Sequence, residues 1–165
     1  MSTHPIDQKV RAAFALIVTS DIRTEKEDES GKIAVSLIEN GGHKVVSHAI
    51  VPNDEAKIRA EVERVLYDNE VQIVITSGGT GISSRDKTVD AVAPFLAREM
   101  PGFGETFRRL SYDEVGGPAI MSRALAGVAY GKLIFCLPGS KNAMQLALNK
   151  LIIPNIGHML WELNR

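Results

Sequence analysis

Four short runs of apolar residues along the chain predict β-strands. Each run is rich in Val, Ile or Leu and stops at turn-forming residues such as Pro, Gly, Ser or Asp. The first run contains no polar residue, as expected of a strand that is buried on both faces of a sheet. The runs cover residues 12–18, 44–51, 71–76 and 133–137.

Apolar residues recur at helical spacing between and after these runs, which predicts amphipathic helices. Gly41-Gly42 is a suitable helix end, and Asn53 or Asp54 is suited to cap the helix that follows. Pro94 lies inside another predicted helix and indicates a kink or a late start, whereas the charged stretch 23–30 is typical of a solvated loop. The predicted helices begin at Gly31 and after Asp54, and then cover 88–98, 103–112, 119–129, 142–153 and 155–163.

Strands that alternate with helices predict an α/β fold, in which a mostly parallel sheet carries helices on both faces. A chain of 165 residues has the length of one ordinary domain, and it contains no internal repeat, low-complexity tract or linker. Residues 1–10 are polar and aperiodic, so we expect a flexible N-terminal arm ahead of a single domain over residues 11–165.

Composition excludes several classes of protein. Nineteen Lys and Arg against 20 Asp and Glu give a formal net charge of −1, which argues against a nucleic-acid partner. The longest apolar run, 12–18, is too short to span a bilayer, and no signal peptide is evident. The single cysteine, Cys136, excludes an intramolecular disulfide and suits a reducing compartment. We therefore expect a cytoplasmic protein with no membrane partner.

The most informative local pattern is a glycine-rich loop, Ser77 to Gly81, directly after the third strand. Seven of the 14 glycines fall between Ser77 and Gly117. Glycines after a strand let backbone amides converge on an anion, although a tight turn alone would also use them. The spacing matches neither a P-loop nor a dinucleotide fingerprint. The hydroxyls, cations and carboxylate that follow over residues 83–87 favour a site for phosphate and magnesium.

Ligands of open parallel sheets bind beyond the carboxyl ends of the strands. This rule selects four segments: Ser20-Asp21, Asn53-Asp54, 77–86 and 138–140. Asp86 and Asp54 are the candidate Mg²⁺ ligands, with helix capping as the alternative role for Asp54. The turn over 138–141 could hold a second phosphate at the start of the next helix or be an ordinary helix entry.

Other familiar chemistries are not supported. His43 and His48 lie five positions apart on a predicted strand, so they face opposite sides and cannot share a metal. Cys136 lies within an apolar strand and is expected to be a core residue. No Gly-x-Ser-x-Gly motif indicates a serine hydrolase.

Several ordered motifs resemble the molybdenum-cofactor biosynthesis family, which includes molybdopterin adenylyltransferase and molybdenum cofactor biosynthesis protein B. The resemblance extends over nearly the whole chain from Ala12 onward. The protein B branch is the more similar, through the segments 109–114 and 122–129. The other motifs are Thr76-Ser77-Gly78-Gly79-Thr80-Gly81, Arg85-Asp86, Glu99-Met100-Pro101-Gly102-Phe103-Gly104-Glu105 and Leu137-Pro138-Gly139-Ser140.

This resemblance implies a three-layer α/β/α domain that assembles as a trimer or hexamer. The implied reaction transfers AMP from Mg-ATP to the terminal phosphate of molybdopterin, releasing pyrophosphate before a molybdenum or tungsten insertion protein acts. Asp86 matches a catalytic aspartate of the family. The expected substrate- and phosphate-binding residues are Ser20, Asp21, Ser77, Gly78, Gly79, Thr80, Gly81, Ser83, Arg85, Glu105, Pro138, Gly139, Ser140 and Lys141.

One position departs from the family pattern. The other catalytic aspartate of the family directly follows a proline, and here that place is Asn53. Either the neighbouring Asp54 substitutes for it, or the chain binds molybdopterin and nucleotide without catalysing adenylylation. A third hypothesis is an unrelated assembly protein whose glycine loops are purely structural.

Overall fold

The computed structural model describes residues 9–22 and 24–165, so the expected flexible arm lies almost wholly outside the described residues. Six strands form one sheet in the order β2-β1-β3-β6-β5-β4. The first four of these pair in parallel, and β5 and β4 add antiparallel strands at one edge. The strands are β1 (Ala13–Thr19), β2 (Lys44–Val51), β3 (Ile73–Ser77), β4 (Arg98–Glu99), β5 (Leu125–Ala129) and β6 (Lys132–Leu137).

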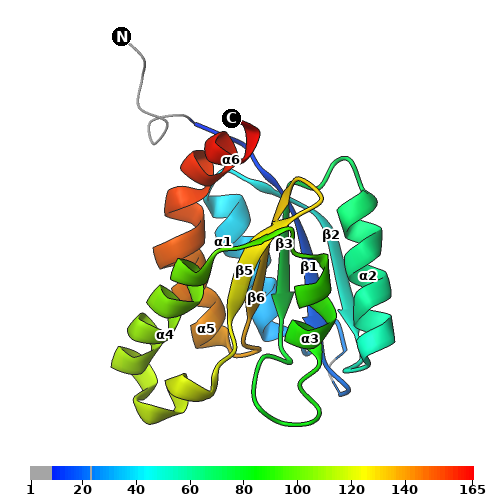
Figure 1. Cartoon of the computed structure of the whole chain (residues 1–165), viewed down its shortest axis with the longest axis vertical. Coiled ribbons are helices and arrows are strands. Elements are labelled where there is room, and N and C mark those ends of the chain that lie inside the picture. The colour runs from blue at the N-terminus through cyan, green and yellow to red at the C-terminus, as the bar shows by residue number, and fades with distance from the viewer. Residues whose placement is uncertain (1–8, 23) are drawn as a thin grey trace.

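Helices cover both faces of the sheet, which confirms the three-layer α/β/α architecture (Figure 1). Alternate residues of the central strands point into two separate apolar cores, because successive side chains of a strand leave opposite faces. One core packs against α1 (Glu29–Asn40), α4 (Pro101–Val115), α5 (Lys141–Leu146) and α6 (Ile156–Asn164). The other packs against α2 (Glu55–Tyr67) and α3 (Thr88–Val92). None of the helices that the described residues form is long and apolar enough to cross a membrane.

Cys136 is a core residue, as predicted. It lies fully buried in β6, and burial raises the pKa of its thiol to about 12. Because only a thiolate is strongly nucleophilic, this cysteine is chemically inert in the folded protein.

The predicted helix over 88–98 is much shorter in the structure. The helix α3 ends at Val92 and passes into a 3-10 turn, Ala93–Phe95, which contains Pro94. Proline has no amide hydrogen to continue a helical ladder, so the chain leaves the helix and enters the short edge strand β4.

The predicted helix over 119–129 is wrong. The segment forms a 3-10 helix, Gly117–Met121, and then the strand β5, which runs back along β6. The two strands are joined by Tyr130 and Gly131, whose φ angles are 51° and 72°. Positive φ at both central residues is the signature of a tight two-residue hairpin, and glycine at the second position favours it.

The C-terminal helices are more irregular than predicted. The helix α5 continues as a π-helix over Ala147–Ile152 and a 3-10 turn over Ile153–Asn155 before α6 begins. Pro154 cannot donate the bond that would close an ordinary helical turn, which fits the change of winding here.

The charged stretch 23–30 is not wholly a solvated loop. The carboxylate of Asp28 is completely buried and accepts hydrogen bonds from the amide of Gly31 (2.9 Å) and from His48 Nε2 (3.0 Å). Asp28 therefore caps α1, which begins at Glu29 rather than at Gly31.

Candidate functional site

Two of the predicted segments meet at the carboxyl edge of the parallel strands, the lower edge of the sheet in Figure 1. The glycine loop after β3 and the turn after β6 wall a hollow of about 270 Å³, which we call the loop hollow. Asp86 also lines it, as the topology predicts for a ligand site. Its lining residues are Gly79, Thr80, Gly81, Asp86, Pro118, Met121, Ser122, Pro138 and Gly139.

Glycine is required at two positions of the loop. Gly78 and Gly79 have φ angles of 100° and 68°, which residues with side chains rarely adopt. A Cβ at Gly78 would lie 2.6 Å from the carbonyl oxygen of Thr19, and one at Gly79 would lie 2.3 Å from Thr88 Oγ1. The glycines therefore let the loop pass close to β1 and α3.

Hydrogen bonds hold the glycine loop against the neighbouring strands and helix. The amide of Gly78 donates to the carbonyl of Leu137 (2.9 Å), and the amide of Thr88 donates to that of Gly79 (3.1 Å). The hydroxyl of Thr19 donates to the carbonyl of Ser77 (3.1 Å) and lies 3.0 Å from the Thr88 hydroxyl. The loop is thereby attached to β1, β6 and α3.

The centre of the loop keeps its backbone donors unused. No hydrogen bond formed among the described residues uses the amides of Gly79, Thr80, Gly81 or Ile82. Consecutive unpaired amides in a glycine-rich turn form a partial positive charge that suits an anion such as phosphate.

Arg123 is the main residue that the sequence reasoning missed. Its amide donates to the carbonyl of Thr80 (2.8 Å), and its guanidinium donates to the carbonyls of Gly81 (2.8 Å) and Asp86 (3.1 Å). The same guanidinium pairs with Asp90 at 3.1 and 3.2 Å, which lowers the pKa of that carboxyl. Arg123 therefore ties the carbonyl side of the loop to α3.

Asp86 closes a compact turn at the end of the loop. Its Oδ2 accepts the amide of Ser83 (3.0 Å), and its own amide donates to the carbonyl of Ser83 (3.0 Å). The hydroxyl of Ser83 accepts the amide of Arg85 (3.2 Å), whose side chain is exposed. Asp86 thus presents its second carboxylate oxygen without a partner among the described residues.

The structure separates the roles of Asn53 and Asp54. Asp54 caps α2 by accepting the amide of Lys57 (2.9 Å), which confirms that role. The buried Oδ1 of Asn53 has no hydrogen-bond partner among the described residues, and a Cβ at Gly79 would lie 3.2 Å from it. The amide of Asn53 donates to Asp21 Oδ1 (2.8 Å). Asn53, rather than Asp54, therefore faces the glycine loop.

Several other residues predicted for the site do not line the loop hollow. The hydroxyl of Ser140 caps α5 by accepting the amide of Ala143 (3.1 Å), and Lys141 pairs with Glu29 (2.9 Å). The hydroxyl of Ser77 is buried and has no partner among the described residues. The structure does not bring Glu105 to the loop hollow, because this exposed residue lies near the start of α4. Ser20 stands at the end of β1, where its amide donates to the carbonyl of Val51 (2.9 Å).

The part of the chain that the structure describes offers no complete metal cage. Across residues 9–22 and 24–165, no group of three or more His, Cys, Asp or Glu residues could hold a metal ion. Mg²⁺ is nevertheless commonly held by one or two carboxylates together with substrate phosphates and water. The open oxygen of Asp86 fits that mode and lies at the loop hollow, whereas Asp54, which accepts the amide of Lys57 at its helix cap, does not line this hollow.

The chain is similar to known proteins over most of its length. Residues 15–158 match the family described as a probable molybdopterin binding domain. Molybdenum cofactor biosynthesis protein B of Bacillus cereus is 44% identical over 151 residues, which cover 91% of this chain and 89% of the relative. The corresponding protein of Bacillus subtilis is 43% identical over the same length and coverage.

Two solved structures share the whole fold. A crystal structure of molybdenum cofactor biosynthesis protein B superposes with a TM-score of 0.91 at 43% identity, covering 94% of this chain and 98% of the other. The tungsten cofactor synthesizing protein of Pyrococcus furiosus gives 0.87 at 32% identity, covering 96% and 100%. The chain therefore belongs to this molybdopterin-binding family of molybdenum cofactor biosynthesis proteins.

Proposed function

We propose that the protein transfers AMP from Mg-ATP to the terminal phosphate of molybdopterin. An oxygen of that phosphate forms a bond to the α-phosphorus of ATP. The bond from this phosphorus to the oxygen that bridges to the β-phosphorus breaks, and that oxygen leaves with pyrophosphate. The product is adenylylated molybdopterin, which a molybdenum or tungsten insertion protein would receive.

The observation that carries the proposal is a row of backbone amides, Gly79 to Ile82, that have no hydrogen-bond partner among the described residues. The first three of these residues line one hollow together with Asp86. Two anionic substrates repel each other, so the barrier is lowered mainly by positioning and by neutralising charge. Backbone amides supply partial positive charge without a nucleophilic side chain, which agrees with the inert Cys136.

Mg²⁺, when bound with ATP, would supply positive charge at the reacting phosphates. Asp86 would hold it through its open carboxylate oxygen. The amide of Ser83 donates to the Asp86 carboxylate and the guanidinium of Arg123 donates to the Asp86 carbonyl, which holds Asp86 in place at the end of the loop.

The direct test is incubation of the purified protein with molybdopterin and Mg-ATP. We expect adenylylated molybdopterin and pyrophosphate in equal amounts, measured by chromatography. The Asp86→Asn variant should lower the rate at least about a hundredfold, because the carboxylate that would hold Mg²⁺ at the reacting phosphates is lost, and should stay folded. Absence of product with any divalent metal would refute the transfer reaction.

A second candidate function is binding of molybdopterin and nucleotide without turnover. It is favoured by Asn53, a neutral amide that faces the loop where the family resemblance implies a carboxylate. In that case the wild-type protein binds both ligands but forms no product, and Asn53→Asp gains activity. Running both proteins in the same assay separates the two candidates, because the transfer proposal requires product from the wild type.

A further inference from the structure

Three consecutive carbonyls of the glycine loop are each held by a hydrogen bond. The carbonyl of Gly79 accepts the amide of Thr88 at 3.1 Å. The carbonyl of Thr80 accepts the amide of Arg123 at 2.8 Å, and the carbonyl of Gly81 accepts Arg123 Nε, also at 2.8 Å. Two of the three donors therefore belong to a single residue, Arg123.

These bonds set the direction of the loop amides. The C=O and N–H groups of a trans peptide point in opposite directions, and the described residues contain no cis peptide bond. The amides of Thr80, Gly81 and Ile82 belong to the same three peptide units as the held carbonyls. Each amide therefore points away from the donor that holds its carbonyl, and no hydrogen bond among the described residues uses it.

The guanidinium of Arg123 is itself held by Asp90 on α3. Its Nη1 and Nη2 donate to Asp90 Oδ1 and Oδ2 at 3.1 and 3.2 Å, a paired geometry that fixes the plane of the guanidinium. In that plane Nε reaches the carbonyl of Gly81, and Nη2 also donates to the carbonyl of Asp86 (3.1 Å). Asp90 thus orients the group that holds the loop, although Asp90 does not line the loop hollow.

We propose that Asp90 and Arg123 are positioning residues, which keep the loop amides directed at the place of the phosphate before the phosphate binds. This inference rests on the proposed function for the phosphate at the loop. Because the amides already have the bound orientation, a phosphate orders little of the loop on binding, and its affinity is higher. Asp90 contacts no substrate and acts only through Arg123.

The decisive variant is Asp90→Asn, tested by calorimetric titration with pyrophosphate in the absence of metal. If charge alone mattered, loss of a negative charge beside an anion site would strengthen binding. We expect the opposite, a loss of affinity of about tenfold, because Arg123 and the loop amides are no longer held in place. Asp90→Glu keeps both carboxylate oxygens and should restore part of the affinity. Equal or tighter binding by Asp90→Asn would overturn the proposal.

A double-mutant cycle tests whether Asp90 acts through Arg123. Arg123→Ala should weaken pyrophosphate binding at least as much as Asp90→Asn, and combining the two should cause no further loss. Additive losses would contradict the proposal. The matched control is Asp113→Asn, which removes the same charge from an exposed ion pair with Arg109 on α4. It should bind as the wild type does; an equal loss in this control would show that surface charge sets the affinity.

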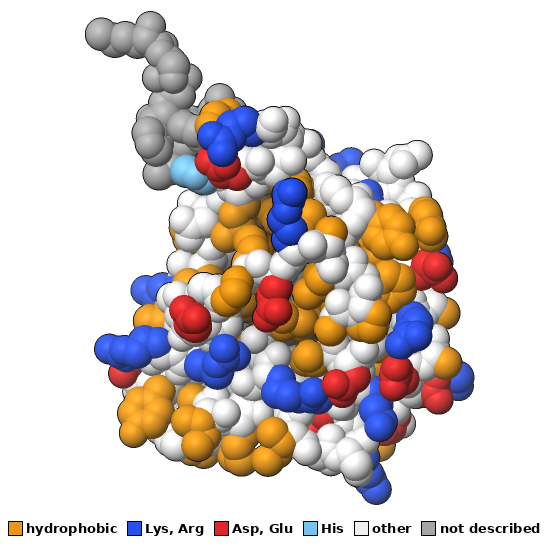
Figure 2. Space-filling model, in the orientation of Figure 1, with side chains coloured by type: hydrophobic (Ala, Val, Ile, Leu, Met, Phe, Trp, Pro, Cys, Tyr) orange, Lys and Arg blue, Asp and Glu red, His pale blue; other side chains and the backbone are white. Residues whose placement is uncertain are grey.

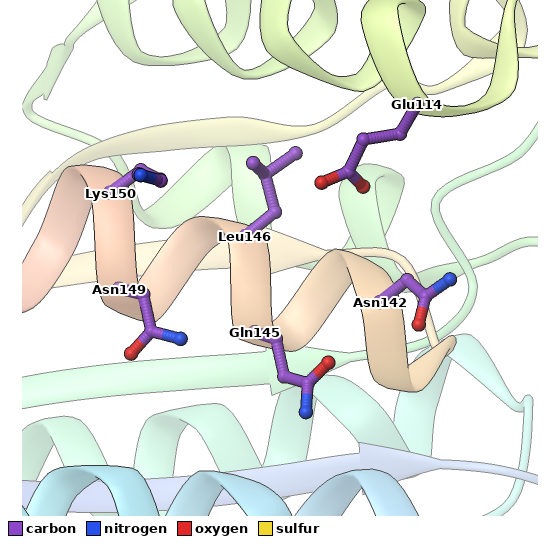
Figure 3. A pocket seen from close by; sticks show the side chains of 6 residues that line it. All are labelled: Glu114, Asn142, Gln145, Leu146, Asn149 and Lys150. Carbon is purple, nitrogen blue, oxygen red and sulfur yellow. The ribbon is translucent and has the colours of Figure 1, made fainter.

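Pyrophosphate could also bind at another hollow, which a further variant tests. A hollow of about 470 Å³ lies between α4 and α5, and Figure 3 shows Lys150 at one end of it. We expect Lys150→Ala to bind pyrophosphate as the wild type does. Loss of binding in this variant would place the anion in that hollow and overturn the positioning role.

The positioning role and the transfer reaction fail separately, because pyrophosphate binding requires no turnover. Weaker pyrophosphate binding by Asp90→Asn, with no adenylylated product from the wild type, would refute only the transfer reaction. Product from the wild type, with undiminished pyrophosphate binding by Asp90→Asn, would refute only the positioning role. A wild-type protein that binds no pyrophosphate would contradict both.

Discussion

His43 illustrates how a buried side chain can be needed in one protonation state. It precedes β2, packs against the ring of Phe14, and accepts the amide of Ala12 at its Nδ1 (3.1 Å). Burial lowers the pKa of His43 below its ordinary value of 6.5. The folded protein therefore holds a neutral imidazole, whereas the unfolded chain takes up a proton as the pH falls through about 6.5.

This difference predicts a loss of stability in mild acid. The contribution of neutral His43 is fully present above pH 6.5 and is lost as the pH falls from there towards the lowered pKa of the folded state. Urea unfolding between pH 7.5 and 5 should show a smaller fall in free energy for His43→Gln than for the wild type. The control His158→Gln, at a half-buried site near the C-terminus, should follow the wild type; equal slopes for all three proteins would contradict the prediction.

At the scale of single residues, the sequence predicts those whose role depends on local neighbours. The glycines of the loop and the caps Asp54 and Ser140 follow from turn and helix-start preferences. Arg123 and Asp28 could not be found in this way, because their partners lie far along the chain: Arg123 bonds to Gly81 and Asp86, and Asp28 to His48.

At the scale of elements, Arg123 links three of them: the strand β5 that follows it, the glycine loop and α3. We predict that Arg123→Ala speeds hydrogen exchange of the hydrogen-bonded loop amides of Ser83, Arg85 and Asp86. It should also lower stability by about 1–3 kcal/mol, because carbonyls lose their charged donor. Arg123→Lys should restore only part of the lost stability, because one ammonium group cannot reach all the acceptors that the planar guanidinium bonds.

The matched control for this prediction is Arg109→Ala. Arg109 is exposed on α4, and Asp113 in the same helix is its one side-chain partner among the described residues, so its loss should change stability by less than about 1 kcal/mol. Unchanged loop exchange in Arg123→Ala would show that the other anchors of the loop are sufficient.

The strands and helices were predictable where their pattern was long or continuous. The predicted strands agree with β1, β2, β3 and β6 to within two residues at each end, because short Val- and Ile-rich runs bounded by turn residues favour strands. The helix predicted over 119–129 is wrong because a short Ala- and Leu-rich run is compatible with either a helix or a strand. Pairing with β6 makes residues 125–129 a strand. The pair Tyr130-Gly131 was the available hairpin signal.

At the scale of the whole molecule, an apolar patch adjoins the loop hollow. Tyr112 and Val115 on α4 and Ile120 and Met121 on the 3-10 helix are 45% to 77% exposed. Figure 2 shows hydrophobic side chains gathered along the lower edge of this face, where the α4 end and the 3-10 helix lie. Exposed clusters of this kind commonly mark a protein interface.

We predict that the protein self-associates through this patch as a trimer or hexamer. Light scattering should give a mass three or six times the 17.9 kDa of one chain. Ile120→Glu should lower that mass by placing charge in an apolar contact, while Tyr67→Glu, at an exposed position on α2, should not. A wild-type mass of one chain would contradict the prediction.

The anchoring of the glycine loop has a consequence for the order in which the protein is made. The loop follows Ser77, but it is held by Leu137 at the end of β6 and by Arg123, both synthesised much later. A nascent chain that has reached only α4 has no β6 against which β3 can pair. Such a chain has the sequence of the glycine loop but not its shape, and closing contacts so distant along the chain is slow. The loop therefore takes its shape only after β6 has been synthesised and the sheet can be completed.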